Sequence, residues 1–144
     1  MKKILFGILI ILFICNCKND DNFQSDCVSE LLPNYTFDTG GTINLNLPQY
    51  NQLQFVGNSL YVAGYGVKGF YLYNTGASIV AFEASDPAHA PNCSRMTQSG
   101  IELICPCDDN VYELLTGQQL EGGTGNCLRN YRVEQIGSVI RVFN

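Results

Sequence analysis

The sequence lacks an apolar segment long enough to cross a bilayer, a stretch with the apolar period of an amphipathic helix, and an excess of basic residues. Its apolar run at 4–14 is shorter than the roughly 20 residues that a transmembrane helix needs. Arginine and lysine total 8 against 13 acidic residues, a formal charge of −5. This charge gives no electrostatic reason to bind nucleic acid, and we expect no such partner. The glycines of 64–69 have the wrong spacing for a phosphate-binding loop.

The N-terminus has the layout of a secretory signal. Met1-Lys2-Lys3 supplies a short basic start, and the apolar run at 4–14 follows it directly. Ile14 stands three residues before Cys17, in a pattern that resembles the bacterial lipobox. Cys17 fits better than Cys15, which would place the bulky Ile14 at the cleavage point. We therefore predict a lipoprotein signal at 1–16 and lipidation of Cys17; the alternative is an ordinary signal peptide with incidental cysteines.

A polar lead-in at 17–41 separates this signal from the rest of the chain. It opens with Cys17-Lys18-Asn19-Asp20-Asp21, which looks like the acidic export signals of surface-displayed Bacteroidetes lipoproteins. The acyl chains of a lipidated cysteine would anchor the protein to a membrane without a transmembrane helix. We expect a lipid-anchored outer-membrane location, on the periplasmic or the surface face. Loss of Lys2 and Lys3 with the signal would change the formal charge from −5 to −7.

Residues 42–144 read as one β domain. Short runs that alternate apolar and polar residues, or that are rich in β-branched and aromatic residues, recur between glycine turns, and no long 3.6-residue period appears. These features predict an all-β sandwich or small barrel of short antiparallel strands, with no second domain. We expect strands at 42–47, 53–56, 59–62, 69–74, 78–83, 100–105, 111–114, 131–135 and 138–143, with a glycine-rich connection at 119–126.

The residue types that carry chemistry gather in two predicted loops. The first contains Asp86, the only histidine, His89, and Cys93; the second reads Cys105-Pro106-Cys107-Asp108. Outside the cytoplasm, cysteines that remain after signal removal form disulfides. Five remain besides Cys17, an odd number, so at least one is free, bound to another group, or paired between molecules. The remaining cysteines are Cys27, Cys93, Cys105, Cys107 and Cys127.

The segment from Ile104 to Val142 contains a series of short motifs. Cys-Pro-Cys comes first, followed by Tyr112-Glu113, Thr116-Gly117 and Gly122-Gly123. A Leu-x-x-Tyr-x-Val motif, formed by Leu128, Tyr131 and Val133, closes the series. This series resembles the Rieske iron–sulfur domain family, which has Phe-Asp in place of Tyr112-Glu113, and the first loop is similar to the family's Cys-x-His-x-x-Cys. The resemblance implies a Rieske-like β fold with two loop hairpins at one tip.

The same resemblance implies that the family's cluster is missing. A Rieske [2Fe–2S] cluster needs two thiolates on one iron and two imidazoles on the other. His89 matches one histidine and Cys105 one cysteine, but Asp86 and Pro87 stand where the other cysteine belongs, and Asp108 replaces the second histidine. The sequence has no further histidine. We expect vestigial cluster loops, no cofactor and no bound metal.

The family also implies a cross-link between these loops. Several Rieske proteins have a disulfide between the positions of Cys93 and Cys107. Cys27 and Cys127 would then remain as a second pair, by parity and exclusion. Cys105 would be a free, partly buried thiol at the end of a strand.

Three other interpretations stay open. Asp86, His89, Cys105 and Asp108 could bind a single metal ion, since each residue type is a competent ligand. Cys105 with His89 could form a nucleophilic thiol, although no acid partner or oxyanion donor is evident. Aromatic residues could form a binding surface for a glycan or peptide, or they could simply fill the core. These aromatics are Tyr61, Tyr65, Phe70, Tyr71 and Tyr73.

Together these observations predict a cell-envelope lipoprotein with a Rieske-like domain that has lost its cluster. We expect it to act as a non-catalytic binding or structural module. The alternative is a redox protein, an electron-transfer component with an unusual iron–sulfur or mononuclear metal centre. The sequence names no protein or small-molecule partner.

Overall fold

The computed structural model of the chain describes residues 32–89, 92–123 and 125–144. The predicted signal at 1–16, Cys17 and most of the lead-in lie outside these residues. Within the described part, no helix has the length and apolar character needed to span a bilayer. The elements are β1 (Ile43–Asn44), η1 (Asn51–Gln54), β2 (Ser59–Val62), β3 (Phe70–Asn74), β4 (Ile79–Glu83), β5 (Thr97–Ser99), β6 (Glu102–Ile104), β7 (Val111–Glu113), β8 (Gln119–Glu121), β9 (Asn130–Ile136) and β10 (Val139–Phe143).

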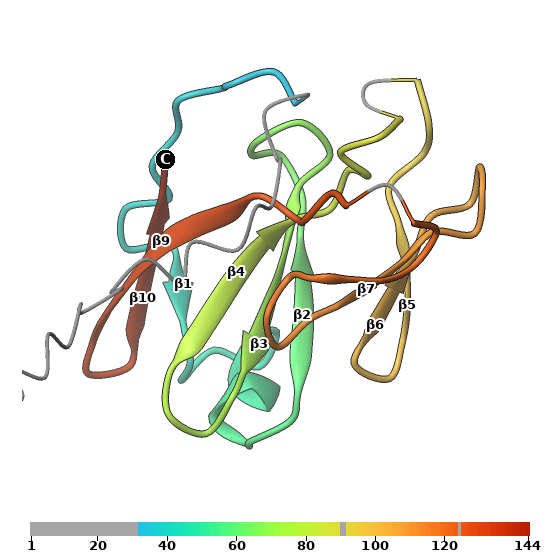
Figure 1. Ribbon diagram of the computed structural model, residues 1–144. Helices are drawn as coiled ribbons and strands as arrows, with labels where there is room; N and C mark the ends of the chain where they lie inside the picture. Colours follow the sequence, from blue (N-terminus) through green and yellow to red (C-terminus); the bar gives the residue numbers. More distant parts are fainter. Residues whose placement is uncertain (1–31, 90–91, 124) are drawn as a thin grey trace, which may run out of the picture.

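These strands form two antiparallel sheets (Figure 1). The larger sheet has the order β1-β10-β9-β4-β3-β2, and the smaller has the order β5-β6-β7-β8. The only helical element among the described residues is the single 3₁₀ turn η1. The predicted all-β fold class is therefore confirmed. The strands predicted at 69–74 and 78–83 pair as the hairpin β3–β4, and those predicted at 131–135 and 138–143 pair as β9–β10.

Two sequence predictions about local structure were wrong. Residues 53–56 were expected to be a strand, but η1 covers Asn51–Gln54 instead, and its Leu53 points into the core as a fully buried side chain. A short apolar run does not distinguish a strand from a helical turn. In addition, the expected connection at 119–126 contains β8, and β5 was not anticipated. Both strands are polar and largely exposed, so no apolar alternation indicates them.

Two neighbouring strands of the large sheet, β3 and β4, bury residues on both of their faces. On β3, Phe70 and Leu72 enter one apolar cluster, whereas Tyr71 and Tyr73 enter another. The first cluster takes residues from all six strands of the large sheet, which must curve around it. The second cluster fills the space between β3–β4 and the small sheet. This second cluster fixes the position of the small sheet and of the loop that it carries.

A buried carboxylate ties the glycine-rich loop at 64–69 to β4. Glu83 is fully buried and accepts backbone N–H bonds from Val67 (2.8 Å), Lys68 (2.9 Å) and Ser85 (2.9 Å). The hydroxyl of Tyr131 on β9 donates a fourth bond at 2.5 Å. A buried carboxylate is tolerated only when such donors satisfy it. The hydrogen bonds of Glu83 therefore hold the loop, β4 and β9 together.

Replacing Glu83 should measurably destabilise the fold. We expect Glu83→Gln to lower the free energy of unfolding by about 2–3 kcal/mol, because an amide cannot accept all four bonds and sets its own NH₂ against a donor. Urea unfolding measures the change. Glu121→Gln, at the exposed end of β8, is the matched control and should change stability by less than about 0.5 kcal/mol. Equal changes in the free energy of unfolding for the two substitutions would show that Glu83 does not hold these elements together.

Candidate functional site

Two loops meet at one end of the molecule, at the upper right of Figure 1. The first follows β4 and runs from 84 to 96, and the second, 105–110, joins β6 to β7. The second loop is closed by backbone bonds from the Cys105 N–H to the Asn110 carbonyl (2.8 Å) and from the Asp109 N–H to the Cys105 carbonyl (3.1 Å). Asp109 adopts a left-handed φ of 60°, which aspartate tolerates better than most residues. The predicted pair of loops at one tip is therefore present.

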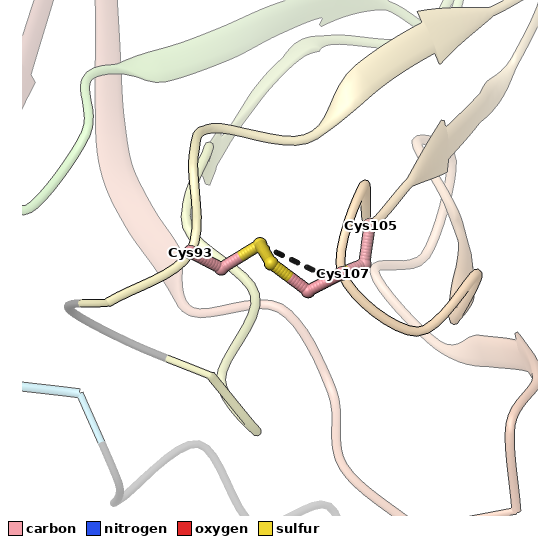
Figure 2. A group of neighbouring side chains, drawn as sticks. All are labelled: Cys93, Cys105 and Cys107. Atoms are coloured by element: carbon pink, nitrogen blue, oxygen red, sulfur yellow. Dashed lines mark hydrogen bonds between the residues drawn. A yellow bond between two sulfur atoms is a disulfide. The ribbon is translucent and has the colours of Figure 1, made fainter.

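A disulfide joins the two loops. Cys93 and Cys107 are bonded, with their Cα atoms 6.1 Å apart, as the family resemblance implied (Figure 2). Cys127 is also in a disulfide. Its predicted partner, Cys27, lies outside the described residues, so that pairing stays a prediction. An all-β domain in which a Cys-Pro-Cys hairpin is bridged to a neighbouring histidine loop is Rieske-like in its architecture.

The third cysteine of the tip, Cys105, is a free thiol. It is completely buried, and its Sγ lies 3.7 Å from Cys93 Sγ, beside the disulfide in Figure 2. Burial, and then the neighbouring Asp86 carboxylate, raise the pKa of this thiol to about 12. The thiolate form is the nucleophile, and this environment disfavours it. The structure thus gives no support to Cys105 as a nucleophile activated by His89.

Four side chains of the two loops converge beside this thiol. Asp86 and His89 come from the first loop, and Cys105 and Asp108 from the second; their ligand-type atoms all lie within 4.8 Å of one another. His89 Nδ1 is 3.2 Å from Asp108 Oδ2 and 3.5 Å from Asp86 Oδ2. These are the four residues that the metal-ion interpretation of the sequence requires.

Asp86 is the anchor of this cluster, because it is fully buried and hydrogen-bonded on both oxygens. Its Oδ1 accepts bonds from the Ala88 N–H (2.7 Å) and the Tyr112 hydroxyl (2.9 Å), and its Oδ2 accepts one from Asn110 Nδ2 (3.3 Å). Burial alone would raise the pKa of Asp86. The interactions with Cys105, Ala88, Tyr112 and Asn110 outweigh burial and lower this pKa. The ionised Asp86 carboxylate is therefore stabilised inside the tip.

Sequence reasoning missed the two residues that orient the carboxylates. Tyr112 was noted only as a motif match, and no role was predicted for Asn110. In the structure both are buried, and Asn110 Nδ2 bridges Asp86 and Asp108, with a distance of 2.6 Å to Asp108 Oδ2. The alternation of β7 placed Tyr112 on the inward face. No sequence signal indicated the bridge by Asn110.

The donor set of this tip does not match a Rieske [2Fe–2S] cluster. Such a cluster takes two thiolates and two imidazoles. The tip offers one imidazole, His89, and one free thiol, Cys105. The two other positions are occupied by the carboxylates of Asp86 and Asp108, with Asp86 immediately before the buried Pro87. These four side chains therefore give no basis for electron transfer through such a cluster.

The predicted aromatic surface is mostly core. Phe70, Tyr71 and Tyr73 are buried, whereas Tyr61 and Tyr65 are partly buried. The two partly buried tyrosines line a shallow hollow of about 690 Å³ beside the glycine-rich loop. No cluster of three exposed aromatics exists among these five residues, so packing explains their positions.

Comparisons with known proteins find similarity in structure alone. No protein-family model matches the chain, and no curated protein matches it. A ferredoxin of Sphingomonas yanoikuyae B1 is 14% identical with a TM-score of 0.47, over 65% of this chain and 93% of that chain. The ferredoxin of carbazole 1,9a-dioxygenase from Nocardioides aromaticivorans IC177 is 17% identical with a TM-score of 0.43, over 61% and 86%.

A third solved structure covers more of the chain. It is a Mycobacterium tuberculosis protein provisionally assigned as an NADH-dependent nitrite reductase small subunit. It is 18% identical with a TM-score of 0.46, over 77% of this chain and 97% of that chain. At these identities and TM-scores, the comparisons assign no activity to this chain.

Proposed function

We propose that this protein is a lipid-anchored component of the cell envelope whose Rieske-like domain has lost its [2Fe–2S] cluster. The domain then serves as a non-catalytic binding or structural module at the membrane surface. One observation carries the proposal: two of the four side chains that converge at the tip are carboxylates, Asp86 and Asp108. Carboxylates do not replace the thiolate and imidazole of a Rieske centre. The basic start, the apolar run and Cys17 support the anchor.

The arrangement of the tip supports a structural role. The disulfide between Cys93 and Cys107 and the hydrogen bonds of Asp86 hold the two loops together without a cluster. Because Asp86, Tyr112 and Cys105 are all fully buried, the inner side of the tip is packed as part of the domain interior. A scaffold that keeps its shape in this way can present the surrounding loops to a partner.

Iron and sulfide assays of the full-length protein separate this proposal from an electron-transfer role. We expect protein expressed anaerobically and extracted with detergent from the membrane fraction to lack iron, acid-labile sulfide and the visible bands of a [2Fe–2S] cluster. Stoichiometric iron and sulfide would refute the loss of the cluster. Recovery in the soluble fraction, with no effect of Cys17→Ser on fractionation, would refute the anchor.

A restored ligand set provides the matched control for the iron and sulfide assays. The double substitution Asp86→Cys and Asp108→His gives the four converging side chains two free thiols and two imidazoles, with His89 and Cys105 already present. If the missing ligands alone account for the loss, this variant should take up a cluster during anaerobic reconstitution while the natural chain does not. Equal uptake by the two proteins would contradict the proposal.

A further inference from the structure

We propose that the tip binds one zinc ion through Asp86, His89, Cys105 and Asp108. The inference goes beyond the proposed function and does not rest on it, because a single zinc ion brings neither iron nor sulfide. The distances among the ligand atoms suit such an ion. Around a tetrahedral zinc, with bonds of about 2.0–2.1 Å to nitrogen and oxygen, neighbouring ligand atoms lie about 3.3–3.4 Å apart. His89 Nδ1 lies 3.2 Å and 3.5 Å from the two carboxylate oxygens.

The remaining ligand, Cys105, completes the set with little movement. All four ligand atoms already lie within 4.8 Å of one another. Closing on one ion requires side-chain shifts of about an ångström, because a zinc–sulfur bond is about 2.3 Å long. The four ligands come from two loops that the Cys93–Cys107 disulfide already joins, so the backbone need not rearrange. Such preorganisation lowers the cost of binding.

The charges at the tip favour a cation. Two carboxylates and a thiol surround one imidazole, and the ion-pair contacts of Asp86 and Asp108 within the described residues are both made with His89. The side chain of Asp86 is fully buried, and that of Asp108 is 30% exposed. Buried carboxylates that lack a full counter-charge are costly, and a divalent cation supplies one.

Outer hydrogen bonds hold the carboxylates in the orientation that a metal ion needs. The Tyr112 hydroxyl and the Ala88 N–H both bind Asp86 Oδ1, which leaves Oδ2 directed at His89. Asn110 Nδ2 then bridges Asp86 Oδ2 and Asp108 Oδ2 and sets their spacing. Partners of this kind fix ligand geometry in metal sites and are a normal part of their construction.

The mixed set of one nitrogen, one sulfur and two oxygens selects the metal. Calcium and magnesium prefer oxygen ligands alone and a higher coordination number, so a thiolate at Cys105 disfavours both. Zinc accepts nitrogen, sulfur and oxygen in four-coordinate geometry, and four protein ligands make a closed, structural site. The ion would add a second link between the two loops, next to the disulfide.

Metal binding by the full-length, detergent-extracted protein with its disulfide intact tests this site. We expect one zinc per chain by titration against a chromophoric chelator, and Co²⁺ substitution should give tetrahedral visible bands and a thiolate charge-transfer band. Asp108→Asn should weaken zinc binding by at least about 100-fold. Mutation of a residue that only hydrogen-bonds to a metal ligand costs up to about this much, and loss of a ligand itself should cost more. Asp109→Asn removes the same charge from the neighbouring exposed residue and should leave affinity unchanged.

Two further variants keep the test decisive if Asp108→Asn disturbs folding. His89→Gln alters a side chain that is 39% exposed and should weaken binding to the same extent. Cys105→Ser should abolish the Co²⁺ charge-transfer band. The inference is overturned by absence of stoichiometric binding or by equal loss in Asp109→Asn. It is also overturned by binding that appears only after reduction, which would assign the metal to Cys93, Cys105 and Cys107 instead.

Discussion

Gly117→Ala should lower the free energy of unfolding by about 3 kcal/mol, because the substitution meets two separate obstacles. Gly117 has a φ of +74°, a left-handed conformation that costs a residue with a Cβ about 1–2 kcal/mol. A Cβ at this position would also lie 2.5 Å from Cε1 of Phe82, and overpacking of this kind costs about 1–3 kcal/mol. Denaturant unfolding measures the sum.

The matched control separates the two costs. Gly123 has a similar φ of +67°, but a Cβ there meets nothing within 4 Å. Gly123→Ala should therefore lose only the conformational part, about 1–2 kcal/mol. Adding Phe82→Leu to Gly117→Ala should cost less than the two single changes together, since the smaller side chain relieves the contact. Strict additivity of the two changes would argue against the predicted clash.

The contact between Gly117 and Phe82 explains the Thr-Gly motif, which the sequence analysis had noted only through the family resemblance. Phe82 lies on β4 of the large sheet, and Gly117 lies between β7 and β8 of the small sheet. The Gly117 backbone packs against the Phe82 ring and also bonds to Glu113 and Leu128. The Thr-Gly pair therefore marks the place where the two sheets touch. The need for glycine there comes from a residue 35 positions away, so no local pattern contains it.

The fold could be predicted from the sequence wherever side chains alternate between two environments. Strands β9 and β10 alternate in this way, and β3 and β4 read as apolar and aromatic runs because they bury both faces. Strands β5 and β8 could not be found, because backbone pairing with β6 and β7 forms them and their side chains are mostly exposed. Pairing of that kind leaves no pattern in the side chains.

The site was predictable in its membership but not in its geometry. The resemblance selected Asp86, His89, Cys105 and Asp108 as positions, yet it gave no reason for two carboxylates to point at one imidazole. Their convergence depends on the packing of the small sheet against β3–β4 and on the buried Asn110 and Tyr112. These are long-range contacts, which spacing along the chain does not reveal.

Removing the tip disulfide should produce the other large loss of stability. The bond links residues separated by 14 positions, and a loop of about 15 residues contributes about 3 kcal/mol by restricting the unfolded chain. For a domain of this size, a loss of about 3 kcal/mol corresponds to a fall of roughly 10–20 °C in Tm. We expect that fall for the double variant Cys93→Ser/Cys107→Ser, measured by thermal unfolding in the presence of a metal chelator.

The two single variants should not behave alike in an oxidising glutathione buffer. Cys107→Ser leaves Cys93 beside Cys105, whose sulfur atoms are already 3.7 Å apart, so a replacement disulfide can form between the same two loops. At the tip, Cys93→Ser leaves Cys105 and Cys107, two positions apart in one loop, and a bond between them would not link the loops. We therefore expect Cys107→Ser to retain most of the stability and Cys93→Ser to lose about 3 kcal/mol.

A third substitution identifies the cause of this asymmetry. Adding Cys105→Ser to Cys107→Ser removes the replacement partner and should lower its Tm to that of Cys93→Ser. Cys105→Ser alone keeps the Cys93–Cys107 bond and should stay close to the unmodified chain, with mass spectrometry of non-reduced peptides identifying the bond in each protein. Equal Tm values for the two single variants would mean that the Cys105 thiol does not form a disulfide with Cys93. Burial of the Cys105 thiol would then prevent the thiol–disulfide exchange that its position would permit.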